Sequence, residues 1–199
     1  MKKIMFNDKY GLTQAVFDGR KTMTRRIANT ATDKQISLGK INKEWYEDEE
    51  GNVYISAYYI GEVIAISQNY KDAGYDGHST FGDSISIKSL PGWTNKMFVK
   101  AEYMPHHIKI TDARLELLQD ISDKDCLQEG IREQFKNCGY GNSMQRRVFG
   151  YVEDKGIKQQ PFDSDSPKEA FAMLIDRISG YGTWENNPFV WVYEFELID

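Results

Sequence analysis

Two long strand-like segments constrain the fold more than any other feature of the sequence. The first is HHIKITDARLELLQDI at residues 106–121, and the second is FVWVYEFELI at residues 189–198. Side chains on a strand alternate between its two faces, and the second segment keeps one parity apolar over its whole length. That parity holds Phe189, Trp191, Tyr193, Phe195 and Leu197. We expect the two strands to pair or to be neighbours in one sheet.

The first of these segments changes phase halfway along. Ile108 and Ile110 share one parity, whereas Ala113, Leu115 and Leu117 share the other. One extra residue near Thr111 or Asp112, a β-bulge, would keep both apolar sets facing the core. The sequence therefore predicts a bulge in this strand.

Short helices are predicted near residues 9–18, 122–130 and 166–179. Gly19 is well placed to end the first helix, because glycine readily adopts the left-handed conformation of a helix C-terminus. Ser122 begins the second, and Ser166 followed by Pro167 and Glu169 begins the third, because both are capping patterns. The third helix is expected to bury one apolar stripe, made of Ala170, Phe171, Leu174, Ile175 and Ile178.

The pattern predicts an α+β domain, with a curled antiparallel or mixed sheet and short flanking helices. A chain of 199 residues suits a single domain spanning 1–199. Three stretches read as insertions, near 29–50, 71–97 and 136–165. The first contains an acidic run that is expected to form a solvated hairpin tip, and the other two are expected to be loop-rich.

Composition narrows the classes of function. The net charge is -5 and the pI is about 5.3, which argues against a protein that coats nucleic acid without specificity. The two cysteines form no disulfide framework, and neither a signal peptide nor a membrane span is recognisable, so a cytoplasmic protein without a membrane partner is expected. His106 and His107 would point to opposite faces of a strand, so no metal site and no cofactor are expected.

One short stretch departs from this acidic character. DGRKTMTRRI, at residues 18–27, gathers four cations within seven residues. They are Arg20, Lys21, Arg25 and Arg26. Four positive charges this close repel one another, which is unfavourable unless an anion or a buried carboxylate compensates. The stretch lies after a predicted helix, at the entry to the next strand, and we interpret it as a functional site.

Three segments carry a resemblance to a known family. FDGRKTMTRRI, ARLELLQDISDKDCLQEGI and GTWENNPFVWVYEFELI together resemble the recurrent segments of the ASCH-domain family, including its longer phage and prophage members. The resemblance implies a small barrel of the PUA-like group, here a curled sheet or open barrel. One branch of that family consists of small bacterial amidohydrolases that act on 4-acetylcytidine.

The resemblance also implies roles for particular residues. Lys21 and Thr24 match the Lys-x-x-Thr motif of those amidohydrolases, and Glu129 matches their distant glutamate. Thr24 would be the nucleophile, Lys21 its base with a pKa lowered by the neighbouring arginines, and Glu129 an acid or an orienting group. Arg20, Arg25 and Arg26 would hold an oxyanion or a phosphate.

Two functions stay open at this point. The first is hydrolysis of an amide on a modified nucleoside. The second is a PUA-like module that binds RNA or a nucleotide without catalysis, with Trp45, Trp93 or Trp184 stacked on a base. Gln68 occupies a place where longer relatives often carry a glutamate, so an acid of those relatives is absent here and binding without hydrolysis is a rival to catalysis. The need for the Thr24 hydroxyl distinguishes the two functions.

Overall fold

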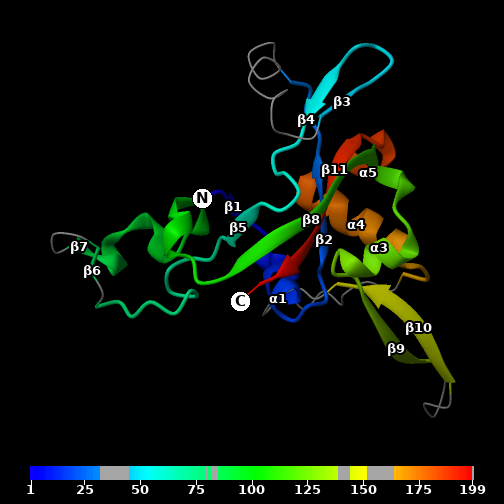
Figure 1. Cartoon of the computed structure of the whole chain (residues 1–199). Helices are drawn as coiled ribbons and strands as arrows, with labels where there is room; N and C mark the ends of the chain where they lie inside the picture. Colours follow the sequence, from blue (N-terminus) through cyan, green and yellow to red (C-terminus); the bar gives the residue numbers. More distant parts are fainter. Residues whose placement is uncertain (32–44, 79, 82–84, 139–143, 152–163, 199) are drawn as a thin grey trace.

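A five-stranded mixed sheet forms the centre of the molecule (Figure 1). The computed structural model describes residues 1–31, 45–78, 80–81, 85–138, 144–151 and 164–198. The strand order is β1-β5-β8-β11-β2, and only the β1–β5 pair is parallel. The strands are β1 (Lys3–Ile4), β5 (Val63–Ile66), β8 (His107–Leu117), β11 (Phe189–Leu197) and β2 (Met23–Ile27). The predicted mixture of helices and a multi-stranded sheet is confirmed, and the sheet is not closed into a barrel.

The two strongest predicted strands, β8 and β11, pair with each other in the antiparallel sense. Glu194 is opposite Asp112, but Phe195 is opposite Ile110, so Thr111 is the extra residue of the pair. This irregularity lies at the predicted bulge. Ile108 and Ile110 before it are fully buried, while Ala113 and Leu115 after it pack against the same core.

Strand β11 is apolar on both faces because it lies between β8 and β2, in the interior of the sheet. Val190, Trp191, Val192 and Tyr193 are all buried. The Tyr193 hydroxyl lies 3.0 Å from the Ser56 hydroxyl and accepts a hydrogen bond from the Ala57 backbone N–H, also at 3.0 Å. These contacts join the sheet to the segment before β5.

The three predicted helices are present as α1 (Leu12–Phe17), α3 (Asp123–Gln128) and α4 (Pro167–Ser179), and a short α5 (Thr183–Asn186) follows. The predicted caps are confirmed, since Ser122 accepts from the Asp125 N–H and Ser166 accepts from the Glu169 N–H. The apolar stripe of α4 packs into the core, except that Ile178 is 38% exposed. The prediction was wrong there because Ile178 lies in the last turn, where the helix leaves the core.

The predicted insertions have different structures in their described parts, and residues 32–44 of the first lie outside the described residues. The acidic run does form a hairpin tip between β3 (Trp45–Glu47) and β4 (Val53–Ile55), where Asp48 accepts backbone hydrogen bonds from Glu50 and Asn52. The second insertion consists of turns, a short strand pair and single-turn 3-10 helices over a small separate cluster: Ala65, Tyr70, Ile87, Val99 and Met104. The strand pair is β6 (Thr80–Phe81) with β7 (Ile85–Ser86).

The third insertion was expected to be loop-rich, and that expectation was wrong for its described part. Strands β9 (Arg132–Cys138) and β10 (Met144–Gly150) pair in register as a hairpin. Figure 1 shows this hairpin projecting away from the central sheet. Its strands were missed because charged residues interrupt the apolar alternation, and burial of the side chains that the structure describes there is confined to the base, at Val148 and Phe149.

Candidate active site

The basic stretch lies where the sequence predicted, after α1 and on the strand that follows: residues 18–22 connect α1 to β2, and Arg25 and Arg26 lie on β2. Gly19 has a φ of 69°, and the backbone N–H groups of Arg20 and Lys21 both bond to the Ala15 carbonyl. This left-handed turn reverses the chain after α1. It directs Lys21 into the protein, where only 2% of the residue is exposed.

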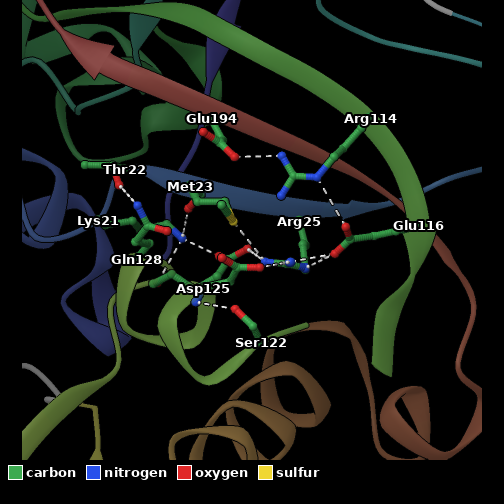
Figure 2. A network of polar contacts seen from close by, with 11 residues as sticks. Lys21, Thr22, Met23, Arg25, Arg114, Glu116, Ser122, Asp125, Gln128 and Glu194 are labelled. Carbon is green, nitrogen blue, oxygen red and sulfur yellow. Dashed lines mark hydrogen bonds and ion pairs between the residues drawn. The ribbon is translucent and has the colours of Figure 1, made fainter. Parts of the chain in front are cut away.

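Three acceptors surround the Lys21 amine. Nζ donates to the Met23 carbonyl at 2.7 Å, to the Glu129 carbonyl at 2.9 Å and to Glu129 Oε2 at 2.6 Å. Figure 2 shows Lys21 and Met23 within this group of contacts. The predicted approach of Glu129 to Lys21 from a distant segment is therefore confirmed.

Glu129 reaches Lys21 because helix α3 ends beside the basic stretch. Glu129 is the C-cap residue, and Gly130 follows with a φ of 105°. A side chain at Gly130 would meet Leu12 at 3.2 Å, so both the backbone angle and the space favour glycine there. The Thr22 N–H donates to the Gln128 carbonyl at 3.0 Å, which fixes the end of α3 against the entry to β2.

Burial lowers the pKa of Lys21 from its ordinary value, and Arg26 and Arg25 lower it further. Glu129 acts in the opposite direction, because its carboxylate favours the charged amine. The sequence predicted the effect of the arginines, but the largest cause is removal of the amine from water. A lowered pKa raises the fraction of neutral amine, which is the form that can accept a proton.

Arg25 is held by carboxylates and does not face solvent. Its side chain is 1% exposed and forms ion pairs with Glu116 at 2.5 Å, Asp125 at 3.3 Å and Glu129 at 3.3 Å. These are the compensating acids that the crowding of cations required. Because its guanidinium is already engaged, Arg25 is poorly placed for the phosphate contact that the sequence reading gave it.

A second arginine extends this network across the sheet. Arg114, on β8, contacts Glu116 at 3.3 Å, Asp112 at 2.6 Å and Glu194 at 2.7 Å. Figure 2 shows Glu116, on β8, in contact with both Arg114 and Arg25. The sequence analysis missed these residues. Asp112, Arg114 and Glu116 share one strand parity, which could have predicted a charged cluster on one face of β8.

A cavity of about 790 Å³ adjoins this network at the edge of the sheet. Lys21, Thr24, Arg25, Arg26 and Glu129 all line it. Thr24 and Arg25 point to opposite faces of β2, but β2 is an edge strand, so a cavity around that edge meets both faces. Apolar side chains form much of the remaining wall, including Leu118, Phe171, Leu174, Ile175 and Val190.

Thr24 is 5% exposed within this cavity. Its hydroxyl forms no hydrogen bond with any residue that the structure describes. Glu129 and Lys21 are in direct contact, whereas Thr24 joins them as a neighbour in the cavity wall. The three residues given catalytic roles by the resemblance thus line one cavity, and of the three only Lys21 and Glu129 are in hydrogen-bond contact.

Arg26 is an exposed cation of this cavity. Its guanidinium donates to the Met5 carbonyl at 2.5 Å and lies 6.0 Å from the centre of the Phe6 ring. The Lys21 amine lies 5.8 Å from the centre of the same ring, so both cations lie close to Phe6. No carboxylate of the described residues forms an ion pair with Arg26.

Arg20 does not line this cavity. It pairs with Asp18 at 2.8 Å and lines a second, smaller cavity on the other side of residues 8–14. The expectation that all the cations surround one cleft therefore fails for Arg20. Neither cavity is lined by any of the tryptophans considered for base stacking, Trp45, Trp93 and Trp184.

Other kinds of site find little support in the described part of the chain. It contains no group of three or more His, Cys, Asp and Glu side chains arranged to hold a metal ion. Burial raises the pKa of the Cys126 thiol to about 12, which suits a structural residue better than a nucleophile. None of the described helices has the length and apolar character needed to cross a lipid bilayer.

Comparison of the chain with protein-family models, with curated proteins and with solved structures found no match in any of the three.

Proposed function

We propose that this protein is an amidohydrolase that removes an acyl group from the amino group of a modified nucleoside, of the 4-acetylcytidine type. One observation carries the proposal. A threonine hydroxyl without a described hydrogen-bond partner lines the same cavity as a buried lysine–glutamate pair. A weak nucleophile needs an adjacent base, and a buried lysine with a lowered pKa can act as one.

The proposed reaction has two stages. Lys21, in its neutral form, accepts the Thr24 hydroxyl proton as Oγ1 attacks the acyl carbonyl carbon, while Glu129 orients the amine. The C–N bond breaks, and the amino group of the base leaves with the proton held by Lys21. Water then attacks the acyl ester on Thr24, which releases the carboxylic acid and restores the hydroxyl.

The cavity supports a ligand of this class. Its volume of about 790 Å³ lies in the range of pockets for small organic ligands. Its apolar wall suits a base and an acyl group, while Arg26 offers an exposed guanidinium to an oxygen of the ligand. The resemblance to ASCH domains supports the same reading, and we propose on that basis a single PUA-like domain.

The experiment measures release of cytidine from 4-acetylcytidine by the parent and by variants at two neighbouring threonines. Thr24→Ala is expected to lower kcat/KM by about a hundredfold or more, because the nucleophile is lost. Thr24→Ser retains a hydroxyl and keeps much of the activity. Thr22→Ala is the matched control, since Thr22 does not line the cavity. Equal turnover by Thr24→Ala and the parent would refute the proposal.

One observation favours a second function, binding of a nucleotide or RNA without hydrolysis. All three N–H groups of a Lys21 ammonium have acceptors, an arrangement that holds the charged form. In that case Arg26 would contact phosphate, and affinity for short RNA would fall as salt rises. Filter binding with Arg26→Gln tests this function, since unchanged RNA binding by that variant would exclude the contact.

A further inference from the structure

The second cavity has a volume of about 460 Å³ and a more polar wall than the first. It lies between the α1 segment, the end of β5 and the start of β9. The residues that matter here are Phe17, Arg20, Gln68, Asp72 and Arg132, all of which line it. Asp8 lines both cavities, so they are neighbours separated by the turn at residues 8–10.

Two guanidinium groups at this cavity share one carboxylate. Asp18 Oδ2 lies 2.8 Å from Arg20 and 4.0 Å from Arg132. No other acid of the described residues pairs with either arginine. Both side chains are about one-third exposed, at 32% for Arg20 and 37% for Arg132. The pair can therefore donate several further hydrogen bonds to an anion.

Gln68 gives an independent indication of a ligand. The residue is 9% exposed, and its side-chain oxygen is buried without a hydrogen-bond partner among the described residues. An unmet buried amide oxygen costs free energy, so such groups normally have a partner. A carboxamide pairs well with a nucleobase edge that offers an adjacent N–H donor and ring-nitrogen acceptor, as in adenine.

The remaining wall fits the same kind of ligand. Phe17 lines the cavity and lies 4.7 Å from His106 between ring centres, with the two rings tilted by 52°. A base could stack on this ring. Asp72 accepts one hydrogen bond from Asn69 at 2.7 Å and keeps its other oxygen for an N–H donor. The cavity thus presents cations for an anion, and an amide, an acid and a ring for a base.

We propose that the second cavity binds a nucleoside monophosphate unit, with its phosphate between Arg20 and Arg132 and its base against Gln68 and Phe17. The phosphate accepts hydrogen bonds from both guanidiniums, whose one carboxylate partner among the described residues is Asp18. The base supplies the hydrogen bonds that the Gln68 amide lacks. This site does not depend on the chemistry at Lys21.

Isothermal titration calorimetry of the full chain with AMP measures the dissociation constant and tests the proposal. AMP is expected to bind at one site, with adenosine at least about tenfold weaker because it lacks the charged group. The double variant Arg20→Gln/Arg132→Gln should weaken AMP to the level of adenosine. Arg147→Gln is the matched control, since Arg147 is an exposed arginine of the same hairpin outside the cavity. It should bind AMP as the parent does.

Gln68→Met separates recognition of the base from that of the phosphate. It should weaken AMP about tenfold while the affinity for inorganic phosphate stays at the parent value. A short 5′-phosphorylated RNA shows whether the site takes a free nucleotide or a nucleotide at the end of an RNA chain. Tighter binding of the RNA than of AMP assigns the site to a nucleotide within a chain, and equal binding assigns it to a free nucleotide.

Three results would overturn the proposal. The first is no AMP binding up to millimolar concentration. The second is a double arginine variant that binds AMP as tightly as the parent, with an unchanged thermal unfolding midpoint. The third is loss of binding in Arg26→Gln with retention in the double variant, which would place the nucleotide in the first cavity.

Discussion

At the scale of single residues, the balance of charge around Lys21 decides what the site can do. Removal from water favours the neutral amine, whereas Glu129 at 2.6 Å favours the ammonium. The balance of these two effects sets the fraction of Lys21 that is neutral and able to act as a base. The sequence predicted this partnership only through the family resemblance, because nothing in local spacing connects residues that are 108 positions apart.

A pH profile follows from the lowered pKa of Lys21. The base must be neutral, so kcat/KM is expected to fall as pH falls, along a limb whose apparent pKa lies below the ordinary 10.5 of lysine. Arg26 lowers the pKa of Lys21, so Arg26→Gln should move this limb to higher pH. Steady-state rates of 4-acetylcytidine hydrolysis across pH provide the measurement. A limb that moves to lower pH in this variant would contradict the assignment.

The thiol of Cys126 should be unreactive in the folded protein. The residue is fully buried, and burial raises the pKa of the thiol to about 12, so almost no thiolate exists at neutral pH. We expect iodoacetamide to label Cys126 only after the addition of denaturant, as read by peptide mass spectrometry. Rapid labelling of the native protein would show that this part of the core opens easily.

At the scale of elements, local sequence signals were sufficient to predict the helix ends and the irregular strand pairing. Ser122, Ser166 and Gly19 identified helix ends, and the phase slip located the irregular pairing at Thr111. The β9–β10 hairpin was not predictable in this way, because it is exposed on both faces along much of its length and has no apolar period. The apolar side of the first cavity was missed for another reason: it comes from α4, whose packing partner is set by tertiary structure.

The cap of α4 should contribute measurably to stability. Ser166 accepts a hydrogen bond from the Glu169 N–H, and its loss in Ser166→Ala is expected to lower the free energy of unfolding by about 1 kcal/mol. Ser179→Ala, at the exposed end of the same helix, is the control and should leave stability unchanged. Urea unfolding of both variants checks this, and equal stabilities would mean that the cap is not used.

At the scale of the whole molecule, one network of charges joins elements that are distant in sequence. Arg25 on β2 contacts acids from β8 and α3, and Arg114 carries the network on to β11. These contacts hold the site against the sheet. The crowding of cations in an acidic chain thus has two explanations: Arg25 is structural, while Lys21 and Arg26 face the cavity.

Two adjacent arginines should therefore differ sharply in their effect on folding. Arg25→Met leaves three carboxylates without their shared partner, and we expect it to lower the free energy of unfolding by about 3–5 kcal/mol. Arg26→Met, at an exposed position of the same strand, should cost less than about 1 kcal/mol. Chemical denaturation of the two variants measures the difference, and similar losses would show that the network does not stabilise the fold.

The central claim is that Thr24 carries the acyl group during hydrolysis, and partitioning with hydroxylamine tests it most directly. An acyl ester on Thr24 can be captured by hydroxylamine in place of water, so 4-acetylcytidine should yield acetohydroxamate at the expense of acetate. The reaction seen with Thr24→Ala is subtracted as background. We predict that the captured fraction rises with hydroxylamine concentration. Enzymatic release of acetate alone, at every hydroxylamine concentration, would contradict the account.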